Sequence, residues 1–178
     1  GPYWYVSGIN PLALASLLQQ DAPAQERMRE HNAVVREQIS KNDGFVVKAQ
    51  GDGFMVAFSD VVAALACTVD IQKAVAEDNE RHPGQQLHVR MGLNCGQVIK
   101  EEEDFFGGVV IVAARICAMA KGDQILVSEA VRVLAGDVSG RRQSLTAMKG
   151  FDLLTPSERE AREALGVFEE SLPAVAWG

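Results

Sequence analysis

Four charged residues lie in or beside segments that are otherwise rich in apolar residues: Lys48, Asp52, Asp104 and Arg115. An arginine among apolar neighbours is costly to bury unless it is paired or faces a ligand. The cations of this group could therefore serve a local pocket for a small anionic ligand. Plainer interpretations stand beside this one. Asp52 could be a turn former, Lys48 and Asp104 solvated residues, and Arg115 a snorkelling or ion-paired side chain.

The composition indicates one globular domain, or a domain and a tail. The chain has 178 residues, of which 47% are hydrophobic, and its net charge of −7 argues against non-specific nucleic-acid binding. It contains no apolar run long enough to span a bilayer, so we expect no membrane contact. Cys67, Cys95 and Cys117 lack a metal-binding spacing and have mostly apolar neighbours, which predicts reduced core residues and a cytoplasmic protein.

The elements that would position the charged residues centre on a hairpin. Two apolar runs, Phe45–Val47 and Phe54–Phe58, flank Gly51-Asp52-Gly53, and an Asp-Gly pair supplies the backbone conformations that a tight turn needs. Periodicity and capping signals predict helices over 12–18, 21–42, 60–80, 109–120, 129–134 and 155–170. Further strands are predicted over 3–9, 87–95, 97–100, 124–127 and 145–151, with Asn10-Pro11 breaking the first.

The order of these elements predicts the fold class. Strand, helix, strand, strand, helix, strand is the split βαβ arrangement of ferredoxin-like folds. We therefore expect an α+β protein with a βαββαβ core, an antiparallel sheet and helices on one face of it. This fold hosts many functions and indicates none by itself.

The residues around the hairpin resemble those of a known family. Residues 47–58, Val-Lys-Ala-Gln-Gly-Asp-Gly-Phe-Met-Val-Ala-Phe, look like the central hairpin of class III nucleotidyl cyclases, the bacterial adenylate cyclases in particular. Further stretches agree in order and spacing, at 29–36, 89–96, 104–116, 124–128 and 148–151. The resemblance implies a cyclase homology domain over 3–151, followed by a C-terminal helical tail over 152–178.

The resemblance also implies a reaction and a site. Members of the family convert ATP or GTP to the 3′,5′-cyclic nucleotide and pyrophosphate at the interface of a head-to-tail dimer, with two Mg²⁺ or Mn²⁺ ions. Carried over, Asp52 is a metal ligand, Lys48 and Asp104 read the adenine of ATP, and Arg115 stabilises the transferring phosphate. These roles imply an adenylate cyclase of cytoplasmic signal transduction that works as a homodimer or with a related cyclase chain.

Two positions depart from the family pattern. The first-strand metal aspartate aligns with Gly8, followed by Pro11 where the family has a phosphate-binding turn, and the ribose-binding asparagine aligns with Ile111. One carboxylate cannot hold two Mg²⁺ ions in the usual way. Two alternatives therefore stay open. The chain is either an adenylate cyclase that is weak alone and needs a complementary partner chain, or an inactive cyclase homology domain that dimerises and acts as a nucleotide-binding or regulatory module.

Overall fold

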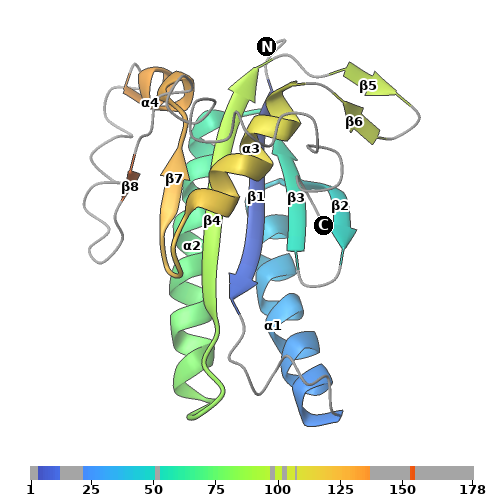
Figure 1. Ribbon diagram of the computed structural model, residues 1–178, viewed down its shortest axis with the longest axis vertical. Coiled ribbons are helices and arrows are strands. Elements are labelled where there is room, and N and C mark those ends of the chain that lie inside the picture. Colours follow the sequence, from blue (N-terminus) through green and yellow to red (C-terminus); the bar gives the residue numbers. More distant parts are fainter. Residues whose placement is uncertain are drawn as a thin grey trace.

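The computed structural model describes residues 4–12, 22–50, 53–96, 99–101, 104–106, 108–136 and 153–154 (Figure 1). The strands are β1 (Trp4–Leu12), β2 (Phe45–Gln50), β3 (Gly53–Phe58), β4 (His88–Gly96), β5 (Ile99–Glu101), β6 (Asp104–Phe106), β7 (Ile125–Val127) and β8 (Leu153–Leu154). The helices are α1 (Ala22–Lys41), α2 (Val61–Glu80), α3 (Gly108–Met119) and α4 (Glu129–Gly136). The predicted helix at 155–170 and the strand at 145–151 lie outside the described residues, as does the predicted helix at 12–18 except for Leu12, which ends β1.

The main sheet has the strand order β2-β3-β1-β4-β7-β8. Its first four strands are antiparallel neighbours in the order of a split βαβ fold, which confirms the predicted βαββαβ core. β7 pairs with β4, and β8 with β7, in parallel, so the whole sheet is mixed. The strand predicted at 97–100 was expected to pair with β4. Instead β5 pairs with β6 in a separate two-stranded sheet, with Glu101 opposite Asp104.

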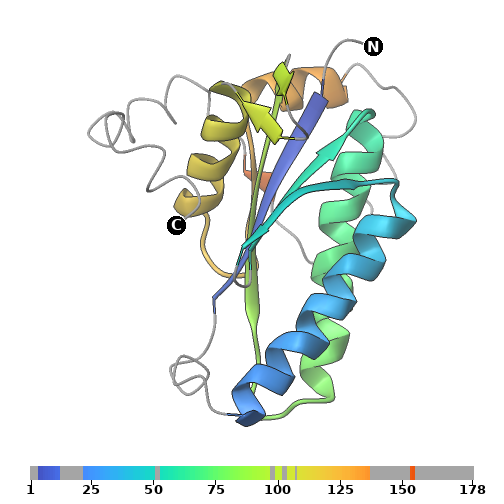
Figure 2. The same cartoon turned by 90° about the vertical axis from the view of Figure 1, so that its right-hand side faces the viewer.

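Helices cover both faces of the sheet, which corrects the prediction that they would share one (Figure 2). α1 and α2 pack on one face, where Val35 and Ile71 join the main core cluster. α3 lies on the other face, where its Ala113 and Ala114 contact Val6 of β1 and Met55 of β3. The sequence predicted a helix at 109–120, which α3 confirms, but the spacing of apolar residues does not say which side of a sheet a helix covers.

The first strand continues through Asn10-Pro11 and does not break there, contrary to the prediction. β1 pairs with β4 as far as Leu12 opposite His88, whereas its pairing with β3 ends at Ile9. Pro11 therefore has a neighbouring strand on the β4 side only. On the β3 side there is no strand at this position, so the absence of a proline N–H costs no hydrogen bond there.

Local signals elsewhere act as expected. Asp60 caps α2, since its carboxylate accepts a hydrogen bond from the Ala63 amide at 3.1 Å. Asp43 ends α1 in the left-handed region with a φ of 57°, and the Gly44 amide donates back to the Ile39 carbonyl at 2.9 Å. In the described part of the chain, no helix is both long and apolar enough to cross a membrane.

Candidate functional site

The predicted base-reading residues belong to two neighbouring hairpins. Lys48 lies on β2, the edge strand, directly after an irregularity in the pairing with β3, and its side chain is exposed. Asp104 begins β6, whose strand lies close to β2; only its backbone is described. Asp52, between β2 and β3, lies outside the described residues. The fold therefore brings the segments of Lys48 and Asp104 to the same edge of the molecule.

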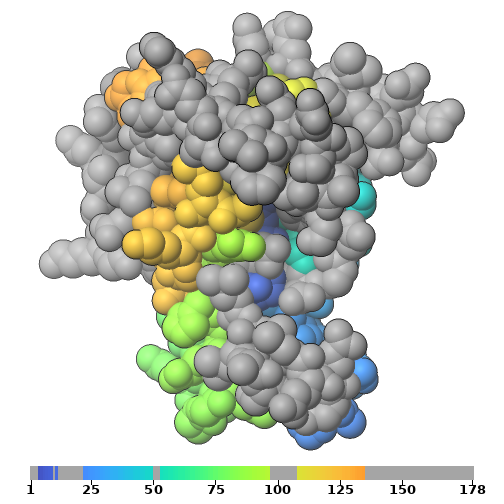
Figure 3. Space-filling model, viewed as in Figure 1, coloured from blue at the N-terminus to red at the C-terminus, as the bar shows by residue number. Residues whose placement is uncertain are grey.

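Arg115 occupies the middle of α3 and is only 5% exposed. This burial excludes the interpretation of Arg115 as a snorkelling side chain with its guanidinium in water. α3 rests against β1 and β4, and part of its outer side is at the molecular surface (Figure 3). Ile111, one turn earlier in the helix, is partly buried and offers no polar atom for a ribose.

The first-strand position that would carry a metal ligand is a buried glycine. Gly8 lies opposite Met55 of β3 and Gly92 of β4, and by alternation along β1 it shares the α3 side of the sheet with Val6. The described residues contain no group of three or more His, Cys, Asp or Glu that could hold a metal ion. Two hard cations need several oxygen ligands. The metal-ligating side chains among the described residues therefore do not fit the two-metal site of the family.

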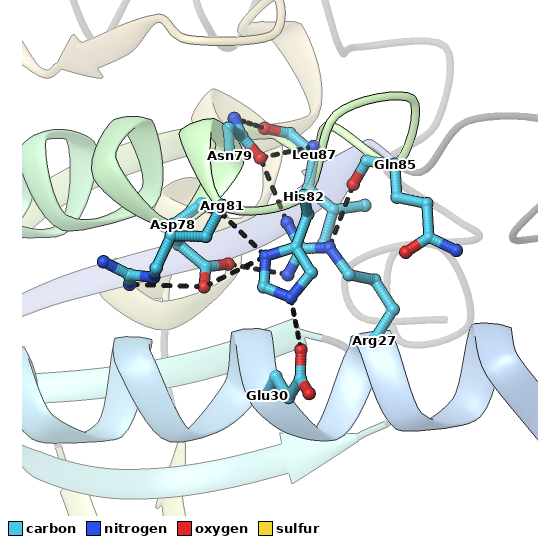
Figure 4. Close-up of polar contacts among 8 residues, drawn as sticks. All are labelled: Arg27, Glu30, Asp78, Asn79, Arg81, His82, Gln85 and Leu87. Carbon is cyan, nitrogen blue, oxygen red and sulfur yellow. Dashed lines mark hydrogen bonds and ion pairs between the residues drawn. The ribbon is translucent and has the colours of Figure 1, made fainter.

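The structure assembles a buried polar cluster that sequence reasoning missed (Figure 4). Arg27 of α1 donates from Nη1 to Asp78 Oδ2 of α2 at 2.6 Å, and the two side chains are only 1% and 4% exposed. The same guanidinium donates from Nε to the Gln85 carbonyl at 2.9 Å and from Nη2 to Asn79 Oδ1 at 3.1 Å. A buried ion pair needs such additional hydrogen bonds to offset its desolvation.

His82 extends the cluster across the two helices. Its Nε2 lies 2.6 Å from Glu30 Oε2 of α1, and its Nδ1 lies 2.8 Å from the Asp78 carbonyl oxygen of α2. The cluster joins the start of α1 to the end of α2, at the opposite end of the molecule from β5 and β6 (Figure 1). We therefore assign it to holding the two helices together and not to the candidate site.

His31 lies in the same region and is fully buried, and neither ring nitrogen has a hydrogen-bond partner among the described residues. Burial, with a further contribution from the charge of Arg27, lowers the pKa of His31 to about 4, while Asp78 acts in the opposite direction. His31 is therefore a neutral core residue. The spacing of Arg27 and His31 with Val35 and Ile39 could have marked both residues as part of the buried face of α1.

None of the three cysteines forms a disulfide. Cys67 and Cys117 are buried and Cys95 is partly buried. Burial raises the pKa of the Cys67 and Cys117 thiols to about 12, so neither provides a nucleophilic thiolate.

Comparison with known proteins agrees with this architecture. The family model for the adenylate and guanylate cyclase catalytic domain matches residues 15–155. The adenylate cyclase of Mycosarcoma maydis is 34% identical over 157 residues, which cover 74% of this chain and 6% of that protein. The putative adenylate cyclase 3 of Rhizobium meliloti (strain 1021) is 32% identical, with 66% and 22% covered. The chain thus spans a small part of these relatives.

Solved structures show the same fold. An adenylate/guanylate cyclase/hydrolase from Silicibacter pomeroyi superposes with a TM-score of 0.66 at 27% identity, covering 78% of this chain and 82% of that one. The guanylyl cyclase Cya2 superposes with a TM-score of 0.64 at 25% identity, with 76% and 79% covered. This chain belongs to the adenylate and guanylate cyclase catalytic domain family, the class III nucleotidyl cyclases.

Proposed function

We propose that two chains assemble head to tail and that this chain forms the nucleotide-binding half of an adenylate cyclase site. Lys48 donates to adenine N1, Asp104 accepts from the N6 amino group, and Arg115 stabilises charge on the transferring phosphate. The Lys–Asp pair matches the edge of adenine, and the curated relatives named above are adenylate cyclases, or putative ones. The other half of the site comes from the partner chain.

The observation that carries this proposal is the burial of Arg115. Arg115 is 5% exposed in the apolar helix α3, at the position where the family resemblance places the arginine that stabilises the transferring phosphate. Gly8 lies on the same side of the sheet as α3. The chain thus keeps the residues proposed for the base and the phosphate, but it lacks a metal-binding carboxylate on β1. Keeping one part of the site and losing the other supports a function in which this chain pairs with a second chain that supplies the missing carboxylate.

A mixing experiment tests the proposal. The variant Gly8→Asp/Arg115→Ala regains a carboxylate on β1 but cannot stabilise the phosphate, whereas the wild type keeps Lys48 and Arg115 and lacks that carboxylate. Cyclic AMP formation from ATP with Mn²⁺ is measured for each chain alone and for the mixture. The mixture should exceed both, because one site of the mixed dimer holds the complementary set.

A second candidate function is a nucleotide-binding or regulatory module without turnover. Gly8 and Ile111 favour it, because they remove a metal ligand and a ribose contact from one domain. ATP binding by calorimetry, with no cyclic AMP from the mixture, would support this candidate against the first. Absence of both binding and turnover would contradict both functions.

A further inference from the structure

We propose that three alternate residues of β4, Arg90, Gly92 and Asn94, form a seat for α3 that determines where Arg115 lies. Side chains alternate along a strand, and Val89, Met91 and Leu93 belong to the core cluster on the α1 and α2 side. The three seat residues therefore face α3. The inference rests on the proposed function, because that function gives the position of Arg115 its meaning.

Gly92 sets the depth of the helix. A Cβ atom at this position would lie 2.1 Å from the Cys117 amide nitrogen, 2.6 Å from the Cys117 Cα and 2.7 Å from the Ile116 carbonyl carbon. All three atoms are helix backbone, which cannot rotate away as a side chain can. Only a glycine allows α3 to approach β4 this closely.

Asn94 and Arg90 fix the helix along its axis. Asn94 Nδ2 donates to the Val109 carbonyl in the first turn of α3 at 3.2 Å. Arg90 Nη1 donates to the Ala118 carbonyl in the last turn at 3.1 Å, and the Cys117 thiol donates back to the Arg90 carbonyl at 3.6 Å. Ala118 is one of the terminal carbonyls that have no partner within the helix, and a cation is favourable at that end. Arg115 lies between the two contacts.

The seat contains buried polar groups at positions where apolar side chains would cost less free energy to bury. Asn94 Oδ1 and Arg90 Nε are buried and have no hydrogen-bond partner among the described residues. Apolar side chains would hold α3 on the sheet without that cost. They would leave its axial position less defined, because apolar contacts are not directional whereas hydrogen bonds are. Directional contacts at both ends of a helix fix its position along its axis, and so they fix the position of each side chain that it carries.

The consequence for Arg115 follows from its spacing, two residues before Cys117. Since ordinary contacts of a Cβ atom are 3.4–4 Å, adding a methyl group at Gly92 must move the helix backbone by about 1 Å. A displacement of that size is enough to misplace a catalytic or binding group and can reduce a rate by about 10²-fold. Arg90, Gly92 and Asn94 are thus positioning residues that act through Arg115.

A double-mutant cycle tests the inference on the complete chain. The probe is a 2′-deoxy-ATP analogue whose 3′-hydroxyl carries an N-methylanthraniloyl fluorophore, so that the ester cannot migrate and the blocked 3′-oxygen cannot be cyclised. Arg115→Ala should weaken its binding by about 10- to 100-fold, the range for a lost hydrogen bond to a charged group. Gly92→Ala should weaken it by roughly tenfold in the wild type but by less than about twofold in the Arg115→Ala background. Asn94→Leu should show the same dependence with a smaller effect.

Gly44→Ala is the matched control. Its Cβ would also be crowded, at 2.8 Å from Ile39 Cγ2 and 2.9 Å from Phe58 Cε1 and Val56 Cγ1, but these side chains lie in the core on the other face. Its effect should be the same with and without Arg115. If Gly92→Ala and Asn94→Leu are likewise independent of Arg115, the seat is merely structural and the inference is overturned. If wild type and Arg115→Ala bind the analogue equally, it is the proposed function that fails.

Discussion

At the scale of single residues, the candidate site depends on a few side chains in unusual surroundings. Arg115 is buried in an apolar helix, Lys48 is exposed on an edge strand, and Gly8 stands where a carboxylate would be expected. The sequence alone identified all three, because a charge in an apolar helix and a glycine in a recurring motif are visible without coordinates. It could not establish the burial of Arg115, which depends on how α3 packs against β1 and β4.

Base choice is a prediction at this scale. Lys48 and Asp104 match the acceptor N1 and the donor N6 of adenine, whereas guanine offers a donor N1 and an acceptor O6 at the same places. ATP should therefore bind more tightly than GTP by about 1–3 kcal/mol, the cost of leaving polar groups unmatched. Isothermal titration calorimetry with both nucleotides measures the difference. Lys48→Ala should reduce it, and equal affinities in the wild type would leave both residues as ordinary surface charges.

At the scale of elements, local signals were sufficient for most helices and for the central hairpin. The Asp60 cap, the 3.6-residue periodicity of α1 and α2 and the apolar runs of β2 and β3 depend on neighbouring residues, and the structure follows them. Contacts between segments that are far apart in the sequence could not be predicted from such local signals. Sequence patterns do not reveal that Arg27 pairs with Asp78, 51 residues away, because both look like surface charges until the two helices pack.

Breaking this ion pair should destabilise the fold strongly. Asp78→Asn leaves the buried Arg27 without its counter-charge, so we expect the free energy of unfolding to fall by about 3–5 kcal/mol. Urea denaturation measures it. The control is Glu37→Gln, which breaks the Lys41–Glu37 pair of 3.2 Å on the surface of α1, where both side chains are 62% exposed. That change should stay within about 0.5 kcal/mol, and similar losses for both variants would contradict the role of the buried pair.

His31 makes the same region sensitive to acid. Burial lowers its pKa in the folded state from 6.5 to about 4, so the unfolded chain takes up a proton between these pH values that the folded chain does not. The contribution of His31 to stability is therefore intact above pH 6.5 and is lost as the pH falls toward 4. A shift of this size corresponds to about 3 kcal/mol.

The pH dependence of His31→Leu separates this residue from other acid-sensitive groups. The variant has no proton to take up on unfolding, so its stability should fall less than that of the wild type between pH 6.5 and pH 4, by about 3 kcal/mol. Urea denaturation at half-unit pH steps provides the comparison. Parallel curves for the two proteins would show that His31 does not titrate differently in the folded and unfolded states.

At the scale of the whole molecule, different helices cover the two faces of the sheet. α1 and α2 bury one face and are joined by the Arg27–Asp78 pair, on the other side of the sheet from α3. The other face carries α3, with Gly8 beneath it on β1 and Lys48 on the edge strand β2. Under the proposed function, α3 and the hairpin of β2 and β3 form the surface that meets a second chain.

If the nucleotide bridges two chains, ATP and dimerisation must be linked. Lys48, Asp104 and Arg115 of one chain would hold ATP against the partner, so ATP binds the dimer better than the monomer. By reciprocity, ATP should tighten the dimer by the same factor, about 5- to 150-fold for typical coupling free energies. Sedimentation equilibrium with and without ATP and Mn²⁺ measures the dimer dissociation constant. Arg115→Ala should remove most of the ATP effect, whereas Glu37→Gln on the opposite side of the sheet should leave it unchanged. A chain that binds ATP while remaining a monomer at high concentration would contradict the shared site, because its nucleotide would then be held by one chain alone.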